Sequence, residues 1–103
     1  MSIVDEIKRR INTVRHTLHA LQREAEEGLT ADDVCDSMRS GFKLVEDYPD
    51  DLRGHSCLIL TWVRSVPVHV ACAPHEDILI IITVYIPTIE EWGEDFKTRR
   101  KIK

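Results

Sequence analysis

The sequence predicts an α+β fold, with two N-terminal helices followed by an antiparallel sheet of three to four strands. Apolar residues recur every three or four positions over residues 2–27, which predicts one long helix. The run 78–86 is rich in β-branched residues and too short to cross a bilayer, so it predicts a central strand buried on both faces. The runs Ser56–Val63 and 67–73 predict its neighbours, and residues 42–46 a short edge strand.

The long helix carries a single apolar stripe. Ser2 and Asp5 form a predicted capping pair at its start, and Gly28 ends it. The stripe consists of Val4, Ile7, Ile11, Val14, Leu18 and Leu21. This spacing favours packing on the sheet and would also suit a partner helix, so a homodimer through the N-terminal helix stays open.

The second helix is predicted between Thr30 and Gly41. Thr30 is a favourable N-cap residue, and Asp32 and Asp33 place negative charge in the first turn. A turn-rich acidic loop follows at residues 47–51, and one helical turn is expected at residues 88–92.

Composition indicates one soluble domain. The chain has 103 residues, 43% of them hydrophobic and 31% charged, and a net charge of −4, which excludes a global basic field for nucleic acid. The three cysteines, Cys35, Cys57 and Cys72, lack C-x-x-C spacing, and the N-terminus lacks an apolar signal core. We therefore expect a cytoplasmic protein with reduced thiols, no membrane contact and no cofactor.

The strongest candidate chemistry combines His69 with Tyr85. Alternation on the 67–73 strand separates His69 from its neighbours Val68 and Val70. If His69 pairs with Thr83, then His69 and Tyr85 share a face, whereas a shift by one residue separates them. A shared face would suit metal-free RNA cleavage, with His69 or Tyr85 handling protons. The alternative is a buried histidine whose ring is satisfied by a backbone carbonyl.

Cations that would hold phosphate are predicted near this face and on the first helix. Arg64 directly precedes the His69 strand, and Arg99 and Arg100 belong to a basic run at residues 97–103 with five cations. His19 and Arg23 lie one helical turn apart and are a second candidate phosphate grip.

Two metal readings are weaker. His55, Cys57 and His75 bring a thiol and two imidazole ligands into the sheet region, but no pair of ligands has zinc-ribbon spacing. The acidic loop 46–51 offers carboxylates to Mg²⁺, yet it lacks the spacing and glycine of a calcium loop. We expect no metal site.

Several motifs, taken in order, resemble a family of small prokaryotic proteins known only as domain of unknown function four-two-five-eight. The resemblance covers about residues 16–101 and rests on the following residues: His19-Ala20 with Arg23, Tyr48-Pro49-Asp50-Asp51, Ser56 to Leu60, Pro67-x-His69-Val70, Ile81 to Pro87, Trp92, and Asp95 to Arg100. Residues 1–15 lie outside it, so we expect a helical extension at 1–15, continuous with the first helix, and a single α+β domain at 16–103.

This family is similar to the RelE/ParE and MqsR-like toxins. The resemblance implies a toxin fold, metal-independent endoribonuclease activity on mRNA, and inhibition by a cognate antitoxin, a small zinc-finger protein. By position it implies His19, Arg23, His69, Tyr85 and Arg100 as site residues.

Two departures from the family pattern remove positive charge from the expected RNA face. Val66 stands where the family tends to have Arg or Lys, and Glu27 where it tends to have Arg. The alternative function is therefore a non-catalytic protein-interaction module or an inactivated toxin homologue.

Overall fold

The computed structural model describes residues 2–100 of the chain. Within these residues the elements are α1 (Ile3–Arg10), β1 (Val14–His16), α2 (Leu18–Glu26), α3 (Ala31–Ser40), β2 (Lys43–Tyr48), β3 (Ser56–Val63), β4 (Val66–His75), β5 (Ile78–Tyr85) and α4 (Ile89–Trp92). The α+β class is confirmed. Lys101 and Lys103, two members of the predicted basic run, lie outside the described residues.

The predicted long helix over residues 2–27 is wrong, because the chain breaks it with a strand. The predicted Ser2–Asp5 capping box opens α1, but α1 ends at Arg10 and β1 follows. Thr17 then caps α2, since its hydroxyl accepts from the Ala20 N–H at 3.0 Å and donates to the Ile82 carbonyl at 2.8 Å. The periodicity concealed this break because α1, β1 and α2 all turn apolar residues toward the same core.

The sheet has five strands in the order β1-β5-β4-β3-β2, whereas three to four were predicted. β1 runs parallel to β5, whereas all other pairings are antiparallel, so the sheet is mixed. Three residues are too few to reveal an alternating pattern, which is why β1 escaped prediction. The predicted Ser56–Val63 strand is confirmed as β3, and the 42–46 edge strand is confirmed as β2 with slightly later bounds.

The prediction that the 78–86 run forms a central strand buried on both faces is also wrong. β5 lies second from one edge, and its residues alternate between buried and half-buried positions. β3 is instead buried on both faces over most of its length, and β4 occupies the centre of the sheet. The short strand β1 covers only the first half of β5, which leaves the second half next to a single neighbour.

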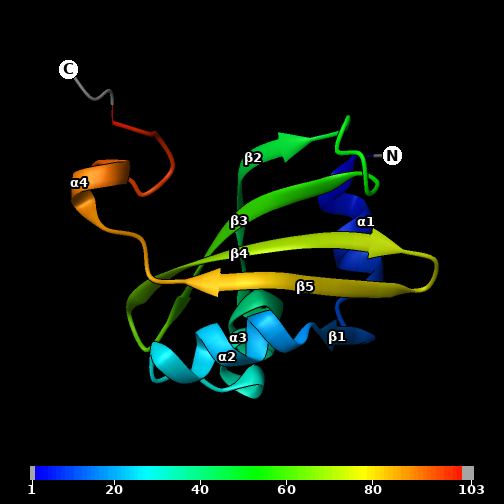
Figure 1. Cartoon of the computed structure of the whole chain (residues 1–103), viewed down its shortest axis with the longest axis horizontal. Helices are drawn as coiled ribbons and strands as arrows, with labels where there is room; N and C mark the ends of the chain where they lie inside the picture. Colours follow the sequence, from blue (N-terminus) through cyan, green and yellow to red (C-terminus); the bar gives the residue numbers. More distant parts are fainter. Residues whose placement is uncertain (1, 101–103) are drawn as a thin grey trace.

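The two faces of the sheet are covered differently. α1, α2 and α3 pack on one face, where Ile7, Ala20 and Val34 join the main core with Val70. On the other face, the chain after β5 passes through α4, which lies beyond the end of β5 and at the far side from α1 (Figure 1). We call residues 86–100 the C-terminal segment.

The second predicted helix is confirmed as α3. Thr30 and Asp33 form a capping box at its start, and Gly41 follows its last residue. Val34 and Met38 of this helix are buried. The helical turn expected at residues 88–92 is confirmed as α4.

No helix among the described residues is both long and apolar enough to span a membrane.

Candidate functional site

His69 lies on the face of β4 that points away from the three N-terminal helices. It pairs directly with Tyr85 on β5, two residues from the Thr83 partner considered from the sequence. An even shift keeps both side chains on one face. The His69 Nδ1 atom lies 3.0 Å from the Tyr85 hydroxyl, and the rings meet edge to face at 5.2 Å. The predicted juxtaposition of imidazole and phenol is therefore present.

The hydrogen-bond partners of His69 fix its tautomer. The Nε2 atom lies 2.6 Å from the Phe96 carbonyl oxygen, which only accepts, so Nε2 carries the proton and donates it. The bare Nδ1 atom then accepts from the Tyr85 hydroxyl. Both ring nitrogens are satisfied and the side chain is completely buried, so the backbone-carbonyl alternative also describes this histidine.

The C-terminal segment forms the cover over His69. Trp92, which is 1% exposed, stacks edge to face on the imidazole at 4.4 Å. The Arg99 guanidinium lies 4.5 Å from the centre of the same indole ring, on which it makes a cation–π contact. The imidazole and Arg99 thus both pack against Trp92.

Arg99 is anchored to the sheet by Glu46 of β2. Its Nε donates to Glu46 Oε2 at 2.6 Å and its Nη2 to Oε1 at 3.0 Å, a bidentate pair. The Tyr48 hydroxyl donates to the same carboxylate. Glu46, Tyr48, His69, Tyr85 and Arg99 therefore gather on one face; we call these five residues the closed-face cluster.

Burial and charge set the protonation states of this cluster. Burial lowers the pKa of His69 below 6.5 and raises the pKa of Tyr85 to about 12, so at neutral pH the imidazole is neutral and the phenol keeps its proton. Arg99 lowers the pKa of Glu46, and in turn Glu46 raises the pKa of Arg99. The cluster therefore holds one neutral base, one protonated acid and one ion pair.

The other predicted phosphate-binding residues lie elsewhere. Arg64 donates to Asp33 of α3 at 3.1 Å, on the helix-covered side of the sheet. Arg23 of α2 pairs with Glu26 at 2.5 Å and Glu27 at 3.2 Å.

Two further candidates have different surroundings. His19 is an exposed residue of α2, away from the closed-face cluster. Arg100 donates from its side chain to the Ile89 carbonyl and from its backbone to the Glu91 carbonyl, which fastens the C-terminal segment to α4. Of the predicted site residues, the structure therefore brings together His69, Tyr85 and Arg99.

Sequence reasoning missed Glu46, Tyr48 and Trp92. Glu46 and Tyr48 stand two positions apart on β2, a spacing that places both on one face, but the predicted edge strand ended at residue 46 and left Tyr48 in the acidic loop. Nothing in the sequence showed that the C-terminal segment folds back over the face. The hydrogen bond from His69 to the Phe96 carbonyl oxygen forms only because the segment folds back in this way.

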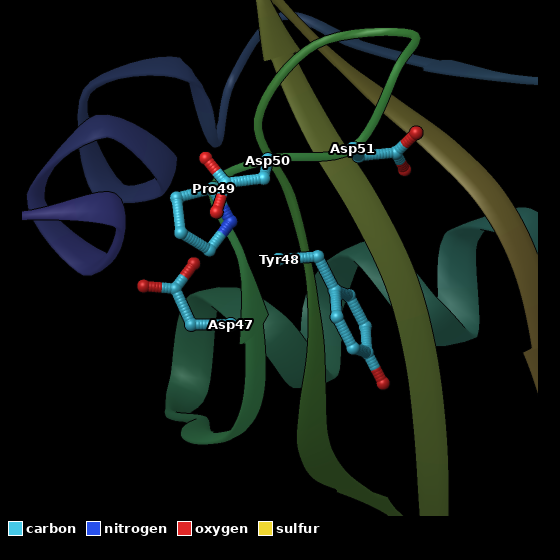
Figure 2. A pocket seen from close by; sticks show the side chains of 5 residues that line it. All are labelled: Asp47, Tyr48, Pro49, Asp50 and Asp51. Carbon is cyan, nitrogen blue, oxygen red and sulfur yellow. The ribbon is translucent and has the colours of Figure 1, made fainter.

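The acidic loop forms an open hollow of about 440 Å³ lined by Asp47, Tyr48, Pro49, Asp50 and Asp51 (Figure 2). Figure 2 shows the carboxylates of Asp47 and Asp51 directed to different sides of the loop. Asp51 accepts from the Ser56 hydroxyl at 2.7 Å and from the Arg53 N–H at 3.1 Å. These bonds lower the pKa of Asp51, so its carboxylate serves to brace the turn.

The histidine and cysteine residues considered as metal ligands are also separated from one another. Cys57 is buried with its Sγ 3.8 Å from that of Cys72, and His55 contacts Asp47. Residues 2–100 contain no group of three or more His, Cys, Asp or Glu side chains that would hold a metal ion.

The fold and site define a small α+β protein with a polar cluster closed over by its own C-terminal segment. The family model of a domain of unknown function, DUF4258, matches residues 16–86, which is more than half of the chain. The chain therefore belongs to the DUF4258 family, and the predicted family membership is confirmed. Comparisons with curated proteins and with solved structures found no match.

The family match ends at Ile86. His69, Tyr85, Glu46 and Tyr48 lie inside it, whereas Trp92, Phe96 and Arg99 lie outside. The cover of the cluster thus lies outside the matched region, and the family resemblance predicted over about residues 16–101 is shown for residues 16–86.

Proposed function

We propose that this protein is a metal-independent endoribonuclease of the RelE/ParE and MqsR-like toxin type, whose reacting groups are His69, Tyr85 and Arg99. The observation that carries the proposal is the 3.0 Å contact between His69 Nδ1 and the Tyr85 hydroxyl, with a guanidinium at the same end of the sheet. Membership of DUF4258 is consistent with it. As in other systems of this type, a small zinc-finger antitoxin would be the partner, and mRNA the substrate.

The chemistry needs a base, an acid and a cation. The base removes the proton of a ribose 2′-hydroxyl, whose oxygen then attacks the adjacent phosphorus. The acid protonates the departing 5′-oxygen, and a 2′,3′-cyclic phosphate is left. A neutral His69 suits the base, a protonated Tyr85 suits the acid, and Arg99 stabilises charge on the phosphate oxygens.

RNA reaches these groups only if the C-terminal segment moves aside. In the structure, Phe96 occupies His69 Nε2, and Glu46 occupies both arms of the Arg99 fork. A phosphate offers the guanidinium the same two-oxygen geometry as a carboxylate, so RNA competes with Glu46 for Arg99. Glu46 is therefore a latch in this proposal, and the closed form is the resting state.

Cleavage of a labelled RNA oligonucleotide by the purified full chain in the presence of EDTA tests the proposal. We expect products ending in a cyclic phosphate, and a Tyr85→Phe variant slower by roughly 100-fold because general acid catalysis typically contributes that much. Glu46→Gln, which weakens the latch, should cleave faster than the wild type. Arg64→Gln is the matched control, since Arg64 lies on the other side of the sheet and should leave the rate unchanged.

The nuclease proposal would be refuted if neither the wild type nor Glu46→Gln, both folded, cleaved the RNA. Unchanged cleavage by Tyr85→Phe would instead refute the assignment of the phenol.

The second candidate function is a non-catalytic protein-interaction module. It is favoured by the complete burial of His69 and by the pairing of Arg23, Arg64 and Arg99 with carboxylates. The predicted apolar stripe does not lie on one continuous helix. Its residue Ile7 is buried in α1, whereas Leu18 and Leu21 of α2 are 71% and 44% exposed. Association through α2 would appear as a mass above that of the monomer in light scattering, which a Leu18→Glu variant should abolish.

A further inference from the structure

A second polar cluster lies on the helix-covered side of the sheet, apart from the closed-face cluster. It joins His16, the last residue of β1, with Glu24 of α2 and Cys35 of α3. The Cys35 Sγ atom lies 3.5 Å from His16 Nε2, and Glu24 Oε2 lies 3.0 Å from His16 Nδ1. The imidazole therefore stands between a thiol and a carboxylate, one at each nitrogen.

The burial of the three groups is graded. Glu24 is 1% exposed, the side chain of His16 is 9% exposed, and Cys35 is half-buried. Despite the short distance to His16, neither Glu24 oxygen has a hydrogen-bond partner of good geometry among the described residues. Burying an unsatisfied carboxylate is costly, and packing alone would be served better by an apolar or amide side chain. Glu24 therefore points to a function of this cluster.

We propose that Cys35 is a thiol-modification site that exchanges with low-molecular-weight disulfides, with His16 as its base and Glu24 as the group that positions the imidazole. The Cys35 sulfur attacks one sulfur of the disulfide R–S–S–R while His16 Nε2 takes the thiol proton. The S–S bond of the reagent breaks, and the departing thiolate receives that proton. The products are the mixed disulfide Cys35–S–S–R and one R–SH, so atoms and electrons balance.

The charges around Cys35 make a base necessary. Burial raises the pKa of the thiol, and Glu24, Asp32 and Asp36 raise it further, whereas Arg39 lowers it. Spontaneous ionisation is therefore disfavoured near neutral pH. Burial also lowers the pKa of His16, against the opposing effect of Asp32, so the imidazole is neutral and free to accept the thiol proton.

Glu24 selects the tautomer that this transfer requires. When ionised, it favours a proton on His16 Nδ1, which leaves Nε2 bare toward the sulfur. Burial raises the pKa of Glu24 to about 7, so Glu24 becomes ionised as the pH rises through neutrality, where the imidazole of His16, whose pKa burial lowers, is already neutral. The other two cysteines lack this environment: Cys57 and Cys72 are 1% and 0% exposed and contact each other.

The test is the rate at which the purified full chain reacts with hydroxyethyl disulfide, a neutral reagent, followed by mass spectrometry between pH 5 and pH 10. We expect one added group, located on Cys35 and absent from Cys35→Ser. The rate should level off near pH 8, because the base is then fully available, whereas an unassisted thiol continues to react faster up to its own higher pKa.

His16→Asn is the informative variant, since its amide reaches toward Glu24 but leaves nothing beside the sulfur. We expect it to react roughly 100-fold more slowly at pH 7 and to lose the plateau. Glu24→Gln should be intermediate, and circular dichroism verifies the fold of each variant.

A wild-type rate that keeps rising to pH 10 would overturn the proposal, and this result does not depend on any variant folding. Equal rates and equal pH profiles for wild type and folded His16→Asn would overturn it as well, because the imidazole would then be only a packing partner.

Discussion

Glu24→Gln should make this protein more stable at alkaline pH. Glu24 is a carboxyl group with 1% exposure, and neither of its oxygens has a well-formed hydrogen bond within residues 2–100. Glutamine has nearly the same shape but carries no charge, so the substitution removes the cost of burying a carboxylate without opening a cavity. The stabilisation should appear only at pH values at which Glu24 is ionised.

The magnitude follows from the pKa of Glu24, which burial raises from 4.5 to about 7. A group whose pKa is raised by folding adds stability below its unfolded pKa, and this stability is lost as pH rises through the folded pKa. A difference of that size corresponds to at most about 3 kcal/mol. Glu24→Gln should therefore match the wild type near pH 4.5 and exceed it by up to about 3 kcal/mol at pH 8.

Urea unfolding of both proteins at pH 4.5 and pH 8 measures this difference. With a slope of about 1–3 kcal/mol/M, the midpoint at pH 8 should increase by about 1–3 M. Glu26→Gln is the matched control, since Glu26 is on the same helix, is 61% exposed, and should change stability by less than about 0.5 kcal/mol. A less stable Glu24→Gln at pH 8 would refute the reasoning and would mean that an ionic Glu24–His16 pair holds α2 on β1.

Three further predictions concern caps and the cover of His69. Thr30→Ala should cost about 1 kcal/mol in urea unfolding, because it removes the hydroxyl that accepts from the Asp33 N–H at 3.0 Å; an unchanged midpoint would contradict the capping box. Trp92→Ala should cost about 3 kcal/mol in urea unfolding through loss of a buried ring, and an unchanged midpoint would contradict the packing of the C-terminal segment on the sheet. The His69 imidazole should titrate below pH 6.5 in NMR spectra with its proton on Nε2, so its contribution to stability is present above pH 6.5 and declines as pH falls; titration above 6.5 would contradict its burial.

The sequence predicts those elements whose signals are local. Thr30 with Asp33 and Gly41 bound α3 because caps act within one turn of the chain. The Ser56–Val63 strand was found with its observed bounds because residues 57–63 form a run that is apolar except for Thr61. The break between α1 and α2 was missed because Thr17 stabilises it partly through the carbonyl of Ile82, far away in sequence.

For the candidate site, too, the sequence predicts what depends on local signals and misses what depends on tertiary contacts. Alternation on β4 and β5 correctly separates His69 and Tyr85 from the main core, once their register keeps an even shift. Arg64 was grouped with His69 because the two residues lie close in sequence. Arg64 stands, however, in the turn between β3 and β4, where Arg64 and Ser65 both have positive φ, and its side chain pairs with Asp33. Arg99 reaches the cluster only because the C-terminal segment folds back, and the position of that segment is a tertiary property.

The two polar clusters meet the requirements of burial in opposite ways, and this difference decides which of them is the more informative. His69 has a partner for each ring nitrogen, so its burial is compatible with a purely structural role as well as with a closed active site. Glu24 lacks a satisfied oxygen, so its burial weakens the fold above pH 7. Groups that lower stability are expected at functional sites. One variant, Glu24→Gln, therefore joins two measurements: if it is both more stable at pH 8 and slower to form the Cys35 mixed disulfide, the buried carboxylate serves the thiol and not the fold.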